Sequence, residues 1–491
     1  MSGALLVVDV GTSSVRSSIV RPDGTVTNTV QVAVLPQSPA PGMVELNARS
    51  LADAVRSTAA TVLSEGGPVA GVGIANQRAS AIVWDATTGE PLGPALGWQD
   101  LRTVIQCLVL QGEGLRLAPN VTATKHQAIL DEVDPDRERS RRGELRCGTV
   151  DSFVAWVLSE GTCFVTDATN AGVTGLVLPD VSDYDDRTLA LLGIDRSTLP
   201  RIVDSSGIVG VASLLPGAPP ICGIAGDQQA SLIGQGCIAP GDAKITFGTG
   251  GMLDMVLGVD QPSASVRGAN GTFPIVTTQL GGAKTWGLEA VALSAGTCVE
   301  WLRDDLGFFD HAAESDALAS SCADSGGVTF VPAFVGLGTP VWDFGARGAL
   351  LGLTRGTGRA EITRAVLEGI AHRGADLVDA AEADGGLKLP RLRVDGGMSR
   401  NTTFVNALAD AVGRPIELSR EREATTRGAG FLAGLAVGTW KSPQEFVEIT
   451  SPEQRVEPTM DESTRRASRE RWLDARGRAE RTIPDLSGVE F

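Results

Sequence analysis

"ALLVVDVGTSSVRSSIV", residues 4–20, joins two runs of β-branched and other apolar residues through a Gly-Thr corner. Such a pattern predicts a β-hairpin. The stretch "AKITFGTGGMLDMVL", residues 243–257, has the same pattern, with a second Gly-Thr corner at 248–249. One hairpin lies near the start of the chain and the other near its middle. The sequence therefore favours two similar halves, with a chance likeness between two hairpins as the alternative.

Helix and strand patterns alternate around the two hairpins. Apolar residues at helical spacing predict helices over 47–67, 149–161, 293–307, 359–386 and 401–413, and short apolar runs predict strands over 69–75 and 389–397. This alternation implies an α/β fold with a mostly parallel sheet. The stretch from about residue 452 onward is charged and predicts a surface helix.

Composition narrows the class of protein. Lys and Arg number 42 against 59 Asp and Glu, and the net charge of −17 argues against a sequence-independent hold on nucleic acid or an anionic membrane. Seven cysteines without a CxxC pair, with three histidines, predict buried reduced thiols and no zinc site. The N-terminus lacks the basic start of a signal peptide, and no apolar run approaches the ~20 residues that span a bilayer. We expect a cytoplasmic protein that binds neither nucleic acid nor membrane.

Three glycine-rich loops have the composition of phosphate-binding loops. They are Gly11–Arg16, Thr246–Gly251 and Asp395–Asn401, and each combines glycines, which permit close backbone approach, with hydroxyl or basic side chains. The third follows an apolar strand and precedes a helix, where backbone N–H groups can face a nucleotide. A serine-rich β-turn is the alternative for the first loop. Neither a Walker A loop nor a GxGxxG motif is present, so ordinary P-loop and Rossmann interpretations fail.

Two aspartates and one polar cluster follow apolar strands. Asp9 ends the first strand, and Asp227 follows an apolar strand in "CGIAGDQQASLIGQG" (222–236). Asp227 is a candidate for the base that takes a proton from a substrate hydroxyl, with a helix N-cap as the alternative. The cluster "NQRAS" (76–80) lies between two predicted strands, in a position where α/β proteins keep their ligands.

Taken in order, these motifs resemble those of the FGGY carbohydrate kinases. The matching stretches are "DVGTSSVR" (9–16), "GIANQR" (73–78), "GWQDLRT" (97–103), "PNVTATK" (119–125), "VTDATNAG" (165–172), "GIAGDQQASLIGQG" (223–236), "TFGTGG" (246–251), "AGTCVEWLRD" (295–304), "VWDFGARGALLGLTRGT" (341–357), "VDGGMSRN" (394–401) and "TRGAGFLAGLAVGTW" (426–440). The resemblance implies two actin-like (ribonuclease-H-like) α/β domains with a catalytic cleft between them. It implies a substrate-side domain at 1–235, a nucleotide-side domain at 236–455 and a charged helical tail at 456–491.

The resemblance also implies roles for individual residues in an ATP-dependent transfer of phosphate to an alcohol. The residues implied to meet the ATP phosphates are Thr12, Ser13, Ser14, Arg16 and Thr249. Those on the adenosine side are Gly296, Glu300, Gly397 and Asn401, with Glu300 in place of a usual glutamine. Those on the substrate side are Arg78, Ala79, Trp98, Asn120, Gln228 and Asp227, the last as catalytic base. Asp9 is implied to place Mg²⁺ through water, because magnesium keeps much of its hydration at nucleotide phosphates.

Within the family the chain is most similar to members that phosphorylate glycerol, but it departs from them at the substrate side. Ala79 stands where those members have glutamate, Asn120 where they have tyrosine, and Met252 where they have another aromatic residue. A lost carboxylate weakens the recognition of hydroxyls, unless Ser80 or Asn120 replaces its bonds, with or without water. The resemblance thus predicts phosphorylation of glycerol to glycerol 3-phosphate, with a larger polyol or ketose, of erythritol, xylulose or ribulose type, as the alternative.

Two less favoured alternatives concern catalysis itself. The chain could be a non-catalytic actin-like nucleotide-binding module, although such a module would not need "NQR", "WQD" or "GDQQ". It could also be a degenerate relative that binds substrate but turns over poorly, against which Asp9, Arg16 and Asp227 argue. The sequence leaves a homodimer open.

Overall fold

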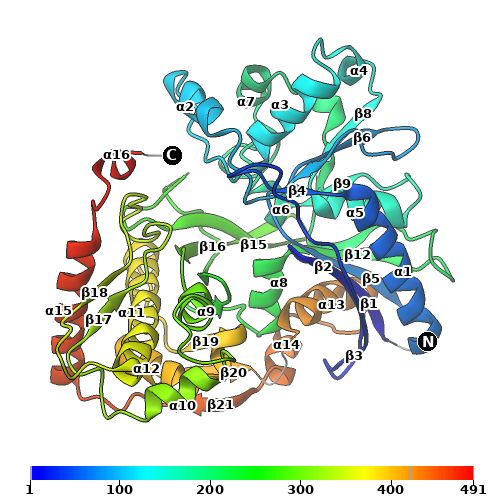
Figure 1. Cartoon of the computed structure of the whole chain (residues 1–491). Coiled ribbons are helices and arrows are strands. Elements are labelled where there is room, and N and C mark those ends of the chain that lie inside the picture. The colour runs from blue at the N-terminus through cyan, green and yellow to red at the C-terminus, as the bar shows by residue number, and fades with distance from the viewer. Residues whose placement is uncertain (1–2, 265, 420–422, 490–491) are drawn as a thin grey trace.

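Two large mixed sheets form the two halves of the protein (Figure 1). The computed structural model describes residues 3–264, 266–419 and 423–489. The first sheet consists of β1 (Leu5–Val10), β2 (Ser14–Val20), β3 (Val26–Ala33), β5 (Gly71–Asn76), β11 (Ser206–Val211) and β12 (Pro220–Gly226). The second consists of β13 (Ala243–Phe247), β14 (Gly251–Gly258), β15 (Phe273–Leu280), β16 (Ala283–Ala292), β19 (Leu392–Asp395), β20 (Ile416–Ser419) and β21 (Pro452–Val456).

Both sheets follow one topological plan. The strand order is β3-β2-β1-β5-β12 in the first sheet and β16-β14-β13-β19-β20 in the second. In each order, three antiparallel strands are followed by two strands parallel to the third. The two predicted hairpins are present as β1–β2 and β13–β14. This repetition confirms the predicted α/β fold with two ribonuclease-H-like domains.

Strand β1 is buried on both faces, as a strand of a covered sheet must be. Its side chains alternate between two cores. Leu6 and Val8 pack in one core with α1 (Ala48–Gly66), whereas Val7 packs in another with α13 (Ala424–Val437). Helix α13 therefore covers the first sheet, although it comes from the second half of the chain (Figure 1).

Two glycines let α13 touch α8 (Asp227–Gly234), the helix that begins with the candidate base. A Cβ at Gly428 of α13 would collide with the carbonyl of Ala230, and a Cβ at Gly234 would collide with the carbonyl of Ala424. Each of the two helices follows the last parallel strand of its repeat. Their close contact, at the middle and the end of α8, fixes α8 against α13.

The other elements surround these two sheets. In the N-terminal half they are β4 (Glu45–Leu46), β6 (Ile82–Asp85), β7 (Ala95–Leu96), α2 (Val104–Gly112), α3 (Thr122–Val133), α4 (Glu138–Arg141), β8 (Leu145–Gly148), α5 (Val150–Leu158), β9 (Val165–Asp167), α6 (Ala168–Ala171), α7 (Asp186–Leu192) and β10 (Arg201–Val203). In the C-terminal half they are α9 (Gly296–Asp304), α10 (Glu314–Ser320), β17 (Thr329–Val331), β18 (Ala349–Leu351), α11 (Arg359–Gly385), α12 (Thr402–Val412), α14 (Gln444–Ile449), α15 (Glu462–Ala479) and α16 (Pro484–Ser487).

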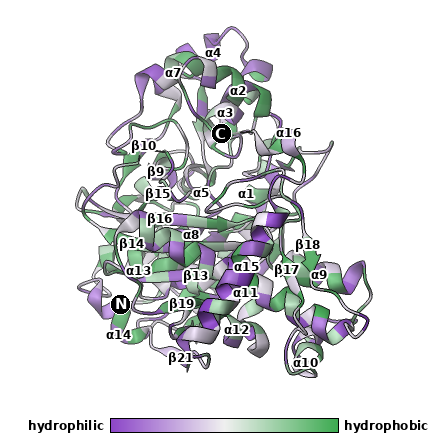
Figure 2. Ribbon diagram, turned by 90° about the vertical axis from the view of Figure 1, so that its left-hand side faces the viewer, coloured by the Kyte–Doolittle hydropathy of each residue, from purple (hydrophilic) through white to green (hydrophobic). Residues whose placement is uncertain are grey.

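The stretch after residue 452 differs from the predicted surface helix. It begins with β21, which pairs antiparallel with β20 at the edge of the second sheet. The side chains of β21 are exposed up to Val456, so no apolar alternation marks the strand in the sequence. Helix α15 then buries Trp472 and Ala475, although Figure 2 shows much of this helix in the hydrophilic colour. The tail is therefore part of the C-terminal core rather than a surface appendage.

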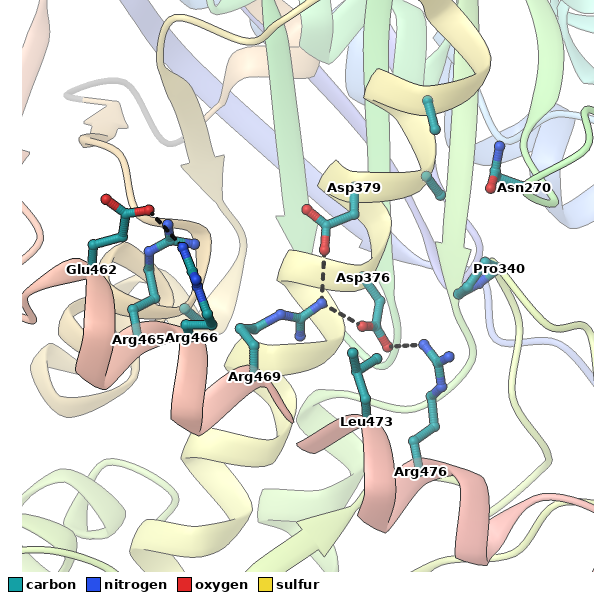
Figure 3. Close-up of a pocket in the computed structure, with 13 residues that line it drawn as sticks. Asn270, Pro340, Asp376, Asp379, Glu462, Arg465, Arg466, Arg469, Leu473 and Arg476 are labelled. Atoms are coloured by element: carbon teal, nitrogen blue, oxygen red, sulfur yellow. Dashed lines mark hydrogen bonds and ion pairs between the residues drawn. The ribbon is translucent and has the colours of Figure 1, made fainter. Parts of the chain in front are cut away.

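A buried carboxylate anchors α15 to α11 (Figure 3). Asp376 of α11 is 1% exposed and lies 2.8 Å from Arg373, 2.8 Å from Arg469 and 3.2 Å from Arg476. The indole N–H of Trp472 donates to the same carboxylate at 3.1 Å. Burial raises the pKa of Asp376, but the three arginines outweigh burial and hold it below its ordinary value. A cavity of about 530 Å³ lies beside this cluster.

Replacing Asp376 by asparagine should destabilise the fold by about 3–5 kcal/mol, because three arginines lose their buried counter-ion. Asp379 is the matched control, since it lies on the same helix and pairs with Arg469 at 2.8 Å but is 65% exposed. Its replacement by asparagine should cost less than about 1 kcal/mol. Chemical denaturation measures both, and equal losses would contradict the anchoring role. The pKa of Asp376 is lower in the folded protein than in the unfolded chain. Asp376 therefore contributes fully to the stability of the fold above its unfolded pKa, and this stability is lost as the pH falls through the folded pKa.

Candidate active site

The carboxyl ends of three neighbouring strands meet at one edge of the first sheet. Val10, Asn76 and Gly226 are the last residues of β1, β5 and β12, and they pair in register. Asp9 comes one residue before the end of β1. The cluster "NQRAS" begins with Asn76, the last residue of β5, and Asp227 directly follows Gly226, the last residue of β12. Ligands of α/β sheets bind outside the carboxyl ends of the strands. The polar candidates of the sequence are thus brought together at one edge.

Asp227 is the first residue of α8, and its side chain remains 31% exposed. Gly226 is the N-cap of that helix, so the alternative role of Asp227 as N-cap is wrong. The carboxylate accepts the backbone N–H of Gln228 at 2.8 Å. Burial raises the pKa of Asp227, and the nearby guanidinium of Arg78 opposes the rise without cancelling it. A carboxylate with a raised pKa is better suited to take a proton than an ordinary aspartate.

Arg78 joins the two halves of the protein. Its Nη2 donates to Glu289 of β16 at 2.5 Å, and its Nε lies 3.6 Å from Asp227. The third guanidinium nitrogen, Nη1, is buried and has no hydrogen-bond partner among the described residues. A buried N–H group without a partner is costly, and a ligand oxygen would satisfy it. This arrangement fits the predicted contact between Arg78 and a substrate hydroxyl.

Two of the three substrate-side departures, Ala79 and Asn120, are linked by a lysine that was not predicted as a site residue. The Nζ of Lys125 donates to the backbone carbonyl of Ala79 at 3.2 Å and to that of Asn120 at 2.9 Å. Ala79 has a positive φ of 59° and is nearly buried. Burial lowers the pKa of Lys125 to about 7. Lys125 thus holds the backbone at both positions, whose own side chains are short.

The first glycine-rich loop contacts the substrate side and the start of α13. Trp98 is half-exposed, and its indole N–H donates to the hydroxyl of Thr12 at 3.3 Å. The Ser14 hydroxyl accepts from Gln31 at 2.9 Å, and Ser13 accepts the N–H of Val34 through its carbonyl at 2.9 Å. The predicted phosphate contacts of these three hydroxyl residues stay predictions.

Arg16 pairs with Glu423, the N-cap residue of α13, and also donates to Gln31 at 3.2 Å. Its expected phosphate contact also stays a prediction. The structure adds Glu423 to the groups that surround the first loop.

Asp9 has the environment of a carboxylate that a cation would stabilise. Burial raises its pKa to about 6, Arg16 opposes this rise, and Asp227 adds to it. A nearby cation would keep the group ionised, so Asp9 fits a role beside hydrated Mg²⁺. Within the described ranges, no group of three or more His, Cys, Asp or Glu side chains is placed to hold a metal ion directly.

The second and third loops contact each other and α9. The N–H of Gly296, the first residue of α9, donates to the Gly248 carbonyl at 2.9 Å, and Thr249 accepts the N–H of Ala295 at 2.9 Å. Gly396 has a φ of 87°, and a Cβ there would collide with the backbone of Phe247, so only glycine brings the third loop this close.

The predicted adenosine-side residues lie on α9 and in the segment that connects β19 to α12. Glu300 is exposed on α9, and Gly397 begins the short helix after β19. The Asn401 side chain accepts the N–H of Phe404 at the start of α12 and donates to Ser315 at 3.0 Å. Asn401 therefore caps a helix, and its contact with adenosine stays a prediction.

Three charged residues of the second sheet reach this site and were not predicted. They are Lys244, Asp254 and Glu289. The available signal was a charged residue within an otherwise apolar strand, as in "AKITF" and "GMLDMVLG". Such a residue is rarely buried unless it is paired, so it indicates a partner elsewhere in the chain.

Comparison with known proteins agrees with this geometry. Models of the FGGY family of carbohydrate kinases match the chain over both domains, the N-terminal one at residues 4–234 and the C-terminal one at 243–437. The chain belongs to the FGGY family of carbohydrate kinases. It is therefore a kinase, a phosphotransferase with an alcohol group as acceptor.

Relatives of this FGGY kinase extend over nearly its whole length. A glycerol kinase of Aromatoleum aromaticum is 42% identical over 97% of this chain and 98% of its own. A glycerol kinase of Symbiobacterium thermophilum is 40% identical over 97% of this chain and 98% of its own. The crystal structure of Plasmodium falciparum glycerol kinase with ADP is similar with a TM-score of 0.90 and 26% identity, covering 100% of this chain and 99% of that one.

A more distant structure, gluconate kinase from Lactobacillus acidophilus, has a TM-score of 0.86 at 21% identity over 99% of this chain and 100% of that one, and it shares the fold. Among the described residues of this FGGY kinase, no helix is both long enough and apolar enough to span a membrane.

Proposed function

We propose that this FGGY kinase transfers the γ-phosphate of ATP to a primary hydroxyl of glycerol, giving glycerol 3-phosphate. The observation that carries the proposal is the Asp227 carboxylate directly after β12, which is 31% exposed and lies 3.6 Å from the Arg78 guanidinium. Glycerol as the acceptor is supported by full-length relatives of about 40% identity that are named glycerol kinase.

Different residues of the site act on the substrate and on the phosphates. Asp227 accepts the hydroxyl proton as the oxygen attacks phosphorus. Arg78, with its free Nη1, donates to a second substrate oxygen and orients the molecule. The glycine-rich loops and Arg16 offset the charge of the phosphates. Mg²⁺, when bound beside Asp9, supplies charge neutralisation at the phosphate oxygens.

An ADP-release assay across glycerol, erythritol, other polyols, xylulose, ribulose and gluconate tests the proposal. We expect glycerol to give the highest kcat/KM. A clearly higher value for a larger polyol or ketose would replace glycerol as the substrate, and ADP release that no acceptor stimulates would refute the proposed function.

The substitution Ala79→Glu tests how this chain compensates for its missing carboxylate. A glutamate there returns an anionic acceptor for a substrate hydroxyl, and a charge-assisted hydrogen bond of this kind lowers the KM for glycerol by about 10-fold. Ala79→Gln is the control of equal size without the charge, and it should give a smaller improvement. An unchanged or raised KM in both variants would mean that glycerol is held here by other groups.

We further infer a cytoplasmic location, because all seven cysteines are free thiols and six of them are buried. The homodimer stays a prediction, which sedimentation of the purified protein would test.

A further inference from the structure

A row of charged side chains crosses the second sheet beside Asp227. Lys244 of β13 is the register partner of Asp254 on β14, which is in turn the register partner of Glu289 on β16. Lys244 and Asp254 are completely buried and form an ion pair at 2.9 Å. Glu289 is the last residue of the row, and it accepts a hydrogen bond from Arg78. Burying charges is costly, so a buried row next to a reacting group calls for a function.

At its other end, the row reaches the substrate side through Lys244. The Nζ of Lys244 donates to the side-chain carbonyl oxygen Oε1 of Gln228 at 2.6 Å and to the hydroxyl of Thr246 at 2.9 Å. Burial lowers the pKa of Lys244, but Asp254 and Asp395 outweigh burial, and the net shift is upward. Lys244 is therefore an ammonium, which has three donors and no acceptor.

This contact decides which way the Gln228 amide points. An ammonium accepts no hydrogen bond, so Gln228 must turn its oxygen toward Lys244 and its Nε2 away from it. Among the described residues, Nε2 of Gln228 has no acceptor. The residue beside the catalytic base thus presents N–H donors, whereas Asp227 presents an acceptor.

We propose that Lys244 is a positioning residue that fixes the Gln228 amide so that a substrate hydroxyl donating to Asp227 accepts a hydrogen bond from Gln228. This inference rests on the proposed kinase function and deepens it. A hydroxyl has one donor and can accept as well, so an acceptor and a donor side by side satisfy it and orient it for attack. Without Lys244, the amide can turn its oxygen toward the hydroxyl, where it competes with Asp227.

The test removes Lys244 without leaving a buried charge unpaired. The unmodified chain is the reference, and Lys244→Met is always introduced together with Asp254→Asn, because replacing both members of a buried pair is often tolerated. Gln228→Met is introduced by itself and also in combination with Lys244→Met. Together these chains form a double-mutant cycle between Lys244 and Gln228. Steady-state kinetics with the best acceptor, the KM for ATP and the melting temperature are measured for each chain.

We expect Lys244→Met to lower kcat/KM for the acceptor by about 10- to 100-fold relative to the reference, with the KM for ATP unchanged. In the chain that already carries Gln228→Met, the same change should have no further effect. Equal acceptor kcat/KM with and without Lys244, or losses that multiply in the combined variant, would overturn the proposal. If Lys244 and Asp254 only stabilised the fold, their replacement would change the melting temperature, the KM for the acceptor and the KM for ATP together.

Gln228→Glu provides a second measurement that does not depend on how the Lys244 variants fold. The glutamate keeps the shape and pairs with Lys244, but it offers no donor to the substrate. We expect the same 10- to 100-fold loss in acceptor kcat/KM, and full activity would overturn the proposal. If the unmodified chain phosphorylates no acceptor at all, the proposed function is wrong. If the unmodified chain is active and the variants are equally active, only the proposed role of Lys244 is wrong.

Discussion

Replacing Asp227 by asparagine is expected to lower kcat by about 10²- to 10⁴-fold, the range in which a positioned acid or base contributes. Asparagine keeps the size of the side chain and the start of α8 but cannot take the hydroxyl proton. Arg78 also loses one of its two carboxylate neighbours, while its 2.5 Å bond to Glu289 remains. ATP binding, measured by calorimetry, should stay close to that of the unmodified chain, because the glycine-rich loops are unaltered.

Asp186→Asn is the matched control for this variant. Asp186 is also the first residue of a helix, α7, but it is exposed and pairs with Arg196 at the surface. We expect its replacement to leave turnover unchanged. If Asp227→Asn retained full turnover, the base would have to be another group, and Asp9, whose pKa is raised to about 6, would be the next candidate.

The fold could be predicted because its signals are local. A β-branched run, a Gly-Thr corner and a returning run identify each hairpin without knowledge of the rest of the chain. The edge strand β21 could not be found in this way, because its side chains are exposed and only its backbone pairs with β20. The burial of α15 also escaped prediction, since it depends on one tryptophan and on Asp376, which lies 96 residues earlier.

The candidate site was predictable where polar residues follow apolar strands, as at Asp9, Asp227 and Arg78. Their partners were not predictable, because pairing in space leaves no mark on spacing in the sequence. Arg78 and Glu289 are separated by 211 positions, and Arg16 and Glu423 by 407. The sequence thus predicted which polar residues follow the strands at the carboxyl edge of the first sheet, whereas the structure supplies the charges that hold those residues in place.

Replacing Arg78 by leucine should lower acceptor kcat/KM by about 100-fold or more, because it removes an orienting donor and the cation beside the base. It should also move the acidic limb of the pH–rate profile to higher pH. The sign follows from the causes that act on Asp227: burial raises its pKa, and Arg78 is the strongest of the groups that lower it. Without Arg78 the pKa of Asp227 rises further, so more of the base is protonated at a given pH.

The same variant should lose about 3–5 kcal/mol of stability, because Glu289 is left buried without its counter-ion. The double variant Arg78→Leu with Glu289→Leu separates the two effects. Removing both charges should restore much of the stability, while kcat/KM stays low and the acidic limb stays displaced. Recovery of activity together with stability would mean that Arg78 only joins the two sheets.

Arg78→Lys, which keeps the charge but loses the fork of donors, should return the pH profile toward that of the unmodified chain and leave the KM for the acceptor raised.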